Sequence, residues 1–144
     1  VGSEMCIRDR FDTAPYSEGC RYETDKGEKV RSKSEVIIAN LLNGYCDVLR
    51  YQYEKPLYLE NDGTEVMVHP DFTVYNLITG KIIYWEHAGM IDDTEYASDF
   101  VRKYNLYLAN GFIPCDNLMI TFECQEKPLD IGNVKRIINK IAEG

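Results

Sequence analysis

The sequence predicts an α/β domain in which helices flank a central mixed sheet. Two observations lead to this class. Periodic apolar segments follow one another in the order helix, three strands, helix, strand, helix. A helix between two strands allows those strands to pair in parallel, and a sheet of this kind is covered by helices. A length of 144 residues suits one domain with its own hydrophobic core.

The N-terminal region is predicted to contribute little to this domain. Residues 1–28 are polar, without periodicity, and are interpreted as an irregular lead-in to a domain at 29–144. The first ten residues, VGSEMCIRDR, resemble translated adapter sequence from metagenome sequencing, so we exclude them from the fold.

The first periodic segment, residues 30–45, is predicted to be a helix. Its apolar residues share one arc at about 100° per residue, and Asn43-Gly44 is typical of a helix end. Glu35 lies at the edge of this arc. Its carboxylate either leans toward whatever the helix packs on or stays on the surface.

Three strands are predicted next, at residues 48–59, 65–75 and 81–87, because apolar residues alternate with polar ones or cluster with aromatic ones. The first strand can break at Pro56. The second must be an edge or be interrupted at Pro70, since proline has no amide hydrogen to donate.

The C-terminal half is predicted to form a helix, a strand at 118–123 and a last helix at 130–142. The first of these helices begins with a capping pattern, Asp92-x-x-Glu95. The apolar arc of this helix is as follows: Tyr96, Ala97, Phe100, Val101, Tyr104, Tyr107 and Leu108. Lys103 falls at the margin of this arc, where the commoner outcome is a surface lysine with a partly covered stem.

Two acids stand at strand ends in the middle of the chain. Glu86 closes the run IIYWE, in which a charge is costly unless it is paired or binds a metal. Asp71 lies in the neighbouring strand, and two carboxylates on adjacent strands can share a Mg²⁺ ion. The alternative is that Asp71 is a turn residue and Glu86 a surface acid.

This order of elements and acids resembles the PD-(D/E)XK nuclease superfamily, which has a restriction-endonuclease-like αβββαβ core. Pro70-Asp71 matches its PD, Glu86 its second acid, and Glu35 the acid that many members carry on the first helix. The resemblance covers residues 30–123. It departs at Ala88, because E-H-A stands where the family has E-x-K.

The resemblance implies a Mg²⁺-dependent (or Mn²⁺-dependent) deoxyribonuclease. Asp71 and Glu86 would hold the metal, with the backbone carbonyl of His87 as an extra ligand. Glu35 would orient a water. Some branches carry the lysine on the following helix, which here is Lys103, and its ammonium would stabilise charge on the phosphate. We therefore expect Lys103 to matter for the reaction more than for the fold.

Composition sets bounds on this reading. A net charge of −8 does not suit a protein whose whole surface grips DNA, so a catalytically inactive nuclease-fold module that binds nucleic acid or protein remains the alternative. An unrelated α/β binding protein is a third reading, and it would leave the three acids far apart.

The setting is predicted from the same data. The branch that this sequence resembles occurs in bacterial and phage proteins, some attached to helicases, so a helicase or other domain missing from this chain is an expected partner. Five scattered cysteines without a C-x-x-C pair favour the reducing cytoplasm over a disulfide framework or a zinc site. No apolar run approaches a membrane span.

Overall fold

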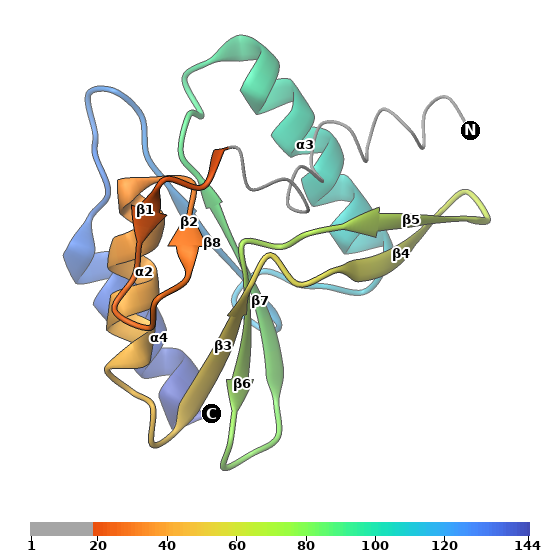
Figure 1. Cartoon of the computed structure of the whole chain (residues 1–144). Coiled ribbons are helices and arrows are strands. Elements are labelled where there is room, and N and C mark those ends of the chain that lie inside the picture. Colours follow the sequence, from red (N-terminus) through yellow and green to blue (C-terminus); the bar gives the residue numbers. More distant parts are fainter. Residues whose placement is uncertain (1–18) are drawn as a thin grey trace.

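The structure is a computed structural model that describes residues 19–144 as a mixed α/β fold, with a four-stranded sheet and three helices in that range (Figure 1). The strand order of the sheet is β3-β6-β7-β8. The strands of this sheet are β3 Leu49–Tyr53, β6 Phe72–Asn76, β7 Ile82–Ala88 and β8 Leu118–Phe122. The helices are α2 Lys33–Asn43, α3 Thr94–Ala109 and α4 Ile131–Glu143. The adapter-like residues 1–10 lie outside the described residues.

Two small antiparallel pairs accompany the main sheet: β1 Tyr22–Glu23 with β2 Lys29–Val30, and β4 Leu57–Asn61 with β5 Thr64–Val68. In the main sheet β6 is antiparallel to β3 and to β7, while β7 and β8 are parallel, with α3 between them in the chain. The predicted parallel pair is therefore confirmed. Within residues 19–144, no helix has the length and apolarity needed to cross a membrane.

The sheet has a different covering on each face (Figure 1). On one face, α2 and α4 pack over a core that contains Phe72 and Trp85. On the other face, α3 and the β4–β5 hairpin enclose a second core around Leu118, against which Tyr84 packs. Since side chains alternate along a strand, Glu86 shares the α3 face with Tyr84, whereas His87 faces the α2 side. The end of β7 therefore presents polar groups to both layers.

Two predicted strands are each divided in two. Residues 48–59 form β3 and β4, which belong to different sheets, and the chain turns between them at Glu54, whose φ is 51°. Residues 65–75 form β5 and β6, separated at residues 69–71 around Pro70. Proline supplies no ladder hydrogen bond, and the break frees Asp71 from regular pairing.

The first helix begins later than predicted. Ser32 is the N-cap of α2 and its hydroxyl accepts a hydrogen bond from the amide of Glu35. Val30 belongs instead to β2, which pairs with a strand inside the predicted lead-in. The pattern Ser32-x-x-Glu35 has the sequence of a capping box, although the Glu35 carboxylate accepts from the amide of Arg31 and not from that of the N-cap.

The second helix also differs from the prediction in its start and its buried arc. Asp93, not Asp92, is the N-cap of α3, and its carboxylate accepts a hydrogen bond from the amide of Tyr96. Asp92 instead accepts a hydrogen bond from the amide of Gln125. The buried arc is rotated: Val101 is 56% exposed, and the buried residues of the helix are Lys103, Leu106 and Tyr107. In α4, the first residue, Ile131, is 44% exposed, whereas Val134, Ile138 and Ile141 are buried.

The cap of α3 can be tested directly. Asp93→Ala is expected to lower the free energy of unfolding by about 1 kcal/mol, the usual effect of losing an N-cap side chain. Asp93→Asn retains an accepting oxygen, so its free energy of unfolding should stay close to that of wild type. The measurement is urea unfolding of both variants beside Asp92→Ala. A larger loss for Asp92→Ala than for Asp93→Ala would contradict the assignment.

Candidate active site

A cavity of about 760 Å³ opens at the end of the sheet, where α2 begins and β7 ends. Many charged side chains line its wall, and four of them come from separate parts of the chain: Glu35 from α2, Asp71 from the segment before β6, Glu86 from β7 and Lys103 from α3. The structure thus brings together all four residues that the sequence singles out for catalysis.

Glu86 and Lys103 form a buried ion pair. The Lys103 Nζ atom lies 2.7 Å from Glu86 Oε2, and the two residues are 6% and 3% exposed. The hydroxyl of Tyr107 donates a second hydrogen bond to the same Oε2 atom. Burial, the first cause, and the charge of Glu86 both raise the pKa of the Tyr107 phenol, which therefore remains a donor. Two donors thus hold Glu86 in one orientation.

Asp71 lies near enough to Glu86 and Glu35 to be affected by the charges of both. Its Oδ2 atom accepts a 2.6 Å hydrogen bond from the backbone amide of His87, which ties the strand break to the end of β7. Burial, followed by the negative charges of Glu86 and Glu35, raises the pKa of Asp71 well above its usual value. The positive charge of Lys103 and the bond from His87 oppose this shift only in part.

Glu35 is 6% exposed, so it is not the surface acid that its helix position allowed. Its Oε1 atom accepts hydrogen bonds of 3.1 Å from the backbone amide of Arg31 and from the Tyr53 hydroxyl. Burial and the charge of Glu54 raise the pKa of Glu35, although these bonds lower it. Glu35 therefore has a capping role at the start of α2 besides its place in the cavity.

Removing the charge of Asp71 should stabilise the metal-free protein. The raised folded-state pKa means that the carboxylate costs stability at neutral pH, so wild-type stability falls as pH rises from the unfolded value of about 3.9 to the raised folded value. Asp71→Asn still accepts the bond from His87 and should melt higher in EDTA at pH 7. It should also show a weaker pH dependence than wild type.

The measurement is thermal melting in EDTA from pH 5 to pH 8. Asp47→Asn, at an exposed acid outside the cavity, serves as the matched control. A lower melting temperature for Asp71→Asn than for wild type at pH 7 would show that the acids do not repel one another.

The side chain of His87 belongs to a separate network on the α2 side of the sheet. Its Nε2 atom lies 2.6 Å from Glu123 Oε1, and its Nδ1 atom lies 2.8 Å from the hydroxyl oxygen of Thr121. Ser34 of α2 donates a hydrogen bond to the same Glu123 oxygen. Burial alone would raise the pKa of Glu123, but the bonds from Ser34 and His87 outweigh it and lower that pKa. The network fastens the ends of β7 and β8 to α2.

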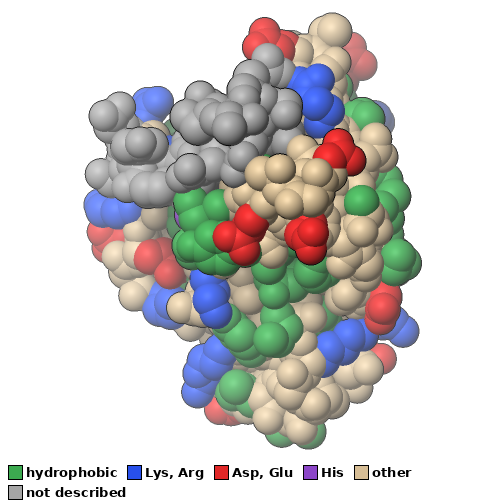
Figure 2. All heavy atoms as spheres, turned by 90° about the vertical axis from the view of Figure 1, so that its right-hand side faces the viewer, with side chains coloured by type: hydrophobic (Ala, Val, Ile, Leu, Met, Phe, Trp, Pro, Cys, Tyr) green, Lys and Arg blue, Asp and Glu red, His purple; other side chains and the backbone are tan. Residues whose placement is uncertain are grey.

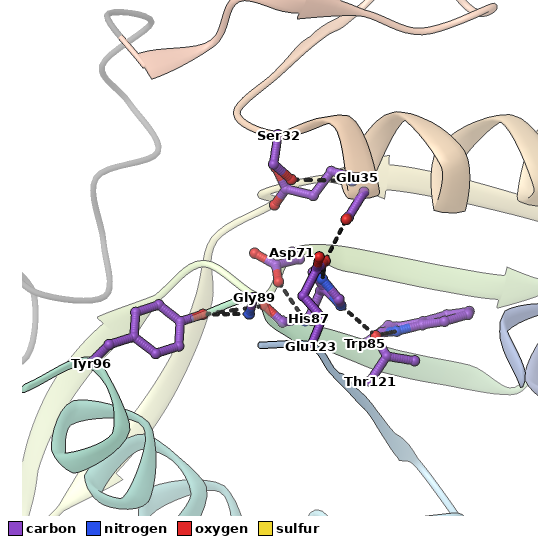
Figure 3. Close-up of polar contacts among 10 residues, drawn as sticks. Ser32, Glu35, Asp71, Trp85, His87, Gly89, Tyr96, Thr121 and Glu123 are labelled. Atoms are coloured by element: carbon purple, nitrogen blue, oxygen red, sulfur yellow. Dashed lines mark hydrogen bonds and ion pairs between the residues drawn. The ribbon is translucent and has the colours of Figure 1, made fainter. Parts of the chain in front are cut away.

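Tyr96 of α3 holds the chain where it leaves β7. Its hydroxyl accepts a 3.0 Å hydrogen bond from the amide of Gly89 and lies 3.4 Å from the carbonyl oxygen of His87. Figure 3 shows this ring pointing at the turn, with Asp71 between that turn and Glu35. The carbonyl that the sequence suggested as a metal ligand is thus in contact with a phenol.

The donor set suits a hard divalent cation in part. No group of three or more His, Cys, Asp or Glu side chains in residues 19–144 is arranged to hold a metal ion. Mg²⁺ needs only one or two protein carboxylates and keeps several waters. The bonds described above use one oxygen each of Asp71 and Glu86, which leaves Asp71 Oδ1 and Glu86 Oε1 for such an ion. A bound cation would also relieve the repulsion between the Asp71 and Glu86 carboxylates.

Sequence reasoning missed Tyr107, Tyr96 and Glu123. Tyr107 stands four residues after Lys103, so the two share a helix face. Glu123 closes the run LMITFE just as Glu86 closes IIYWE, and that parallel was a usable sign. Tyr96 gave no sign beyond its place in an aromatic helix.

No family model matches the chain, and no solved structure matches it. The chain is similar to the uncharacterized protein MJ1519 of Methanocaldococcus jannaschii, with 35% identity over 99 residues. The match covers 68% of this chain and 8% of that protein, so the chain spans less than a tenth of the relative's length.

Proposed function

We propose that this chain is a metal-dependent nuclease that hydrolyses phosphodiester bonds of DNA, built on a restriction-endonuclease-like core. The observation that carries the proposal is the meeting of Glu35, Asp71, Glu86 and Lys103 around one cavity. They come from four segments that are distant in the sequence, and two of them are buried charges held in contact. Perturbed, buried charges that converge in a cavity are typical of active sites.

The element order supports the core assignment. When the inserted β4–β5 hairpin is set aside, the order is α2, β3, β6, β7, α3, β8, which is the αβββαβ order of the superfamily. Asp71 precedes β6 and Glu86 lies near the end of β7, as the PD and the second acid would require. Lys103 supplies from α3 the ammonium that Ala88 cannot supply from β7.

The proposed reaction adds water across a P–O bond and releases a phosphate end and a hydroxyl end. Asp71 and Glu86, with the carbonyl of His87, would hold Mg²⁺ or Mn²⁺, and the bound ion supplies Lewis-acid chemistry at the phosphate. Lys103 would stabilise negative charge that develops on the phosphate oxygens. The raised pKa of Glu35 makes it a suitable proton acceptor for the attacking water.

A second candidate is a module with the same fold that binds nucleic acid or protein without cleaving it. One contact favours it: Glu86 Oε2 already accepts bonds from Lys103 and Tyr107, which reduces what this acid offers to a metal. Both candidate functions use the same cavity, and they differ only in whether the bound nucleic acid is cleaved.

The deciding experiment combines cleavage and melting. The purified chain is incubated with plasmid and single-stranded DNA in Mg²⁺, Mn²⁺ or EDTA, beside Asp71→Asn and Glu86→Gln. We expect metal-dependent cleavage by wild type only. Millimolar metal should raise the melting temperature of wild type and leave Asp71→Asn unchanged, because a ligand of the native state stabilises it by mass action.

Each outcome separates the candidates. DNA binding without cleavage in any metal would favour the non-catalytic module. An equal metal-induced rise in the melting temperatures of wild type and Asp71→Asn would contradict a metal site at Asp71.

The proposed setting is a larger DNA-processing protein of the reducing cytoplasm, with a helicase or other domain outside this chain. All four cysteines in the described range, Cys20, Cys46, Cys115 and Cys124, are free thiols. That state suits a reducing compartment.

A further inference from the structure

Part of the sheet face on the α3 side is left open to solvent. The side chains that share this face on three neighbouring strands, before Glu86 is reached, are Arg50, Gln52, Thr73, Tyr75, Ile82 and Tyr84. Arg50 and Gln52 are exposed, Ile82 is 42% exposed and the two tyrosines are half-buried, whereas Thr73 is buried. An exposed sheet face with accessible aromatic and aliphatic groups is typical of an interaction site.

Two tyrosines and a lysine form a cluster on this face. The Lys55 Nζ atom donates a 2.8 Å hydrogen bond to the Tyr75 hydroxyl and lies 5.4 Å from the centre of its ring. Tyr75 in turn donates to Gln52 Oε1 at 2.7 Å. Tyr84 packs edge-on against Phe112, with ring centres 5.1 Å apart at 88°. The rings are therefore held in place before any ligand arrives.

The charge of this surface is opposite to that of the chain. The net charge of the chain is −8, yet none of the six positions on this face carries an acid, and Arg50 and Lys55 provide positive charge. Figure 2 looks onto this side of the molecule and shows hydrophobic side chains, a class that includes tyrosine, between groups of Lys and Arg, with Asp and Glu side chains above them. A ligand that matches it has flat apolar rings and negative charge.

We propose that this face, which we call the tyrosine face and define by Arg50, Lys55, Tyr75, Ile82 and Tyr84, binds single-stranded nucleic acid. Bases stack on the tyrosine rings, and phosphates lie against Arg50 and Lys55. Stacking of bases on aromatic rings beside basic side chains is how proteins bind single strands without regard to sequence. The binding requires neither metal nor turnover, so it does not depend on the cavity being catalytic.

A single strand fits this face better than a duplex. Base faces are accessible in a single strand and are hidden in the stack of a duplex. Tyr75 and Tyr84 stand on adjacent strands, diagonally related through Ile82 and Thr73, so their Cα atoms are roughly 7–8 Å apart. Two rings at that spacing can serve two bases. Two cations alone would hold a duplex only weakly.

The test is binding of a fluorescent oligothymidylate of fifteen nucleotides to the whole chain in EDTA. Binding is measured by fluorescence anisotropy at low and at physiological salt. Loss of both rings in Tyr75→Leu/Tyr84→Leu should weaken binding by on the order of tenfold or more. The pair Tyr75→Phe/Tyr84→Phe keeps the rings and should retain binding. Tyr58→Leu changes a tyrosine that is 59% exposed on the β4–β5 hairpin and should have no effect.

The basic side chains have a matched control of their own. Lys55→Ala should weaken binding and reduce its salt dependence, whereas Lys29→Ala, at an exposed lysine of β2, should do neither. Melting curves for each variant confirm that the fold is kept. A duplex of the same sequence should bind more weakly than the single strand.

Several results would overturn the proposal. They are no binding by wild type, equal binding after loss of both rings, failure of the phenylalanine pair to retain binding, or equal displacement by polyglutamate, which would indicate a charge-only or protein-binding surface. The cavity is tested separately in Asp71→Asn/Glu86→Gln. If oligothymidylate binding disappears there and survives loss of the rings, the cavity binds the strand and the tyrosine face does not.

Discussion

Lys103→Ala is expected to destabilise the fold by about 3–5 kcal/mol, the usual consequence of removing one partner of a buried ion pair. Lys103 Nζ and Glu86 Oε2 are 2.7 Å apart, and both side chains are almost inaccessible. Without the ammonium, the bond from Tyr107 remains on Glu86 Oε2. The remaining carboxylate would act on Asp71, whose pKa is already raised by burial and by the charge of Glu86.

Chemical unfolding of Lys103→Ala and of a variant that lacks both charges measures this effect. Glu86→Gln/Lys103→Met removes both charges and should recover most of the lost stability, since an uncharged pair of similar size is often as stable as the ion pair. Lys81→Ala breaks an exposed ion pair with Asp116 and should change stability by less than about 1 kcal/mol. Similar unfolding of Lys103→Ala and wild type would mean that water already reaches the pair.

Loss of the same lysine should also lower cleavage by on the order of a hundredfold or more, the scale for losing one group that stabilises transition-state charge. Lys103→Arg should restore little, because a planar guanidinium does not reproduce a compact ammonium in a buried contact. Lys81→Ala should cleave at the wild-type rate.

The rates are measured at saturating metal and at a temperature where unfolding curves show every variant fully folded. That condition separates the reaction from the stability effect of the same substitution. Full activity in a folded Lys103→Ala protein would assign the positive charge at the phosphate to another residue.

Much of the architecture could be read from local patterns. Apolar periodicity located α2, α3 and α4 and the four strands of the main sheet, because each element must bury one face whatever its neighbours are. The helix between β7 and β8 was enough to predict that those strands are parallel. The three acids were singled out because each interrupts or borders an apolar pattern.

The boundaries could not be obtained in this way. The alternation at 65–75 continues without a break through Pro70, and only the pairing of β5 with β4 and of β6 with β7 shows that the segment serves two sheets. Similarly, Asp92 and Asp93 are equivalent as capping residues in the sequence. Docking of residue 125 on Asp92 decides between them.

For the candidate site, too, the sequence predicted some features and the tertiary structure decided others. The sequence by itself determined which charged side chains interrupt or border an apolar pattern: Glu35, Asp71, Glu86 and Lys103. Only the tertiary structure decided that Lys103 is buried against Glu86, because that contact depends on how α3 packs against the sheet and the β4–β5 hairpin. Local periodicity describes one helix at a time, whereas an ion pair between α3 and β7 depends on how separate elements pack, and that packing made Lys103 a part of the fold as well as of the site.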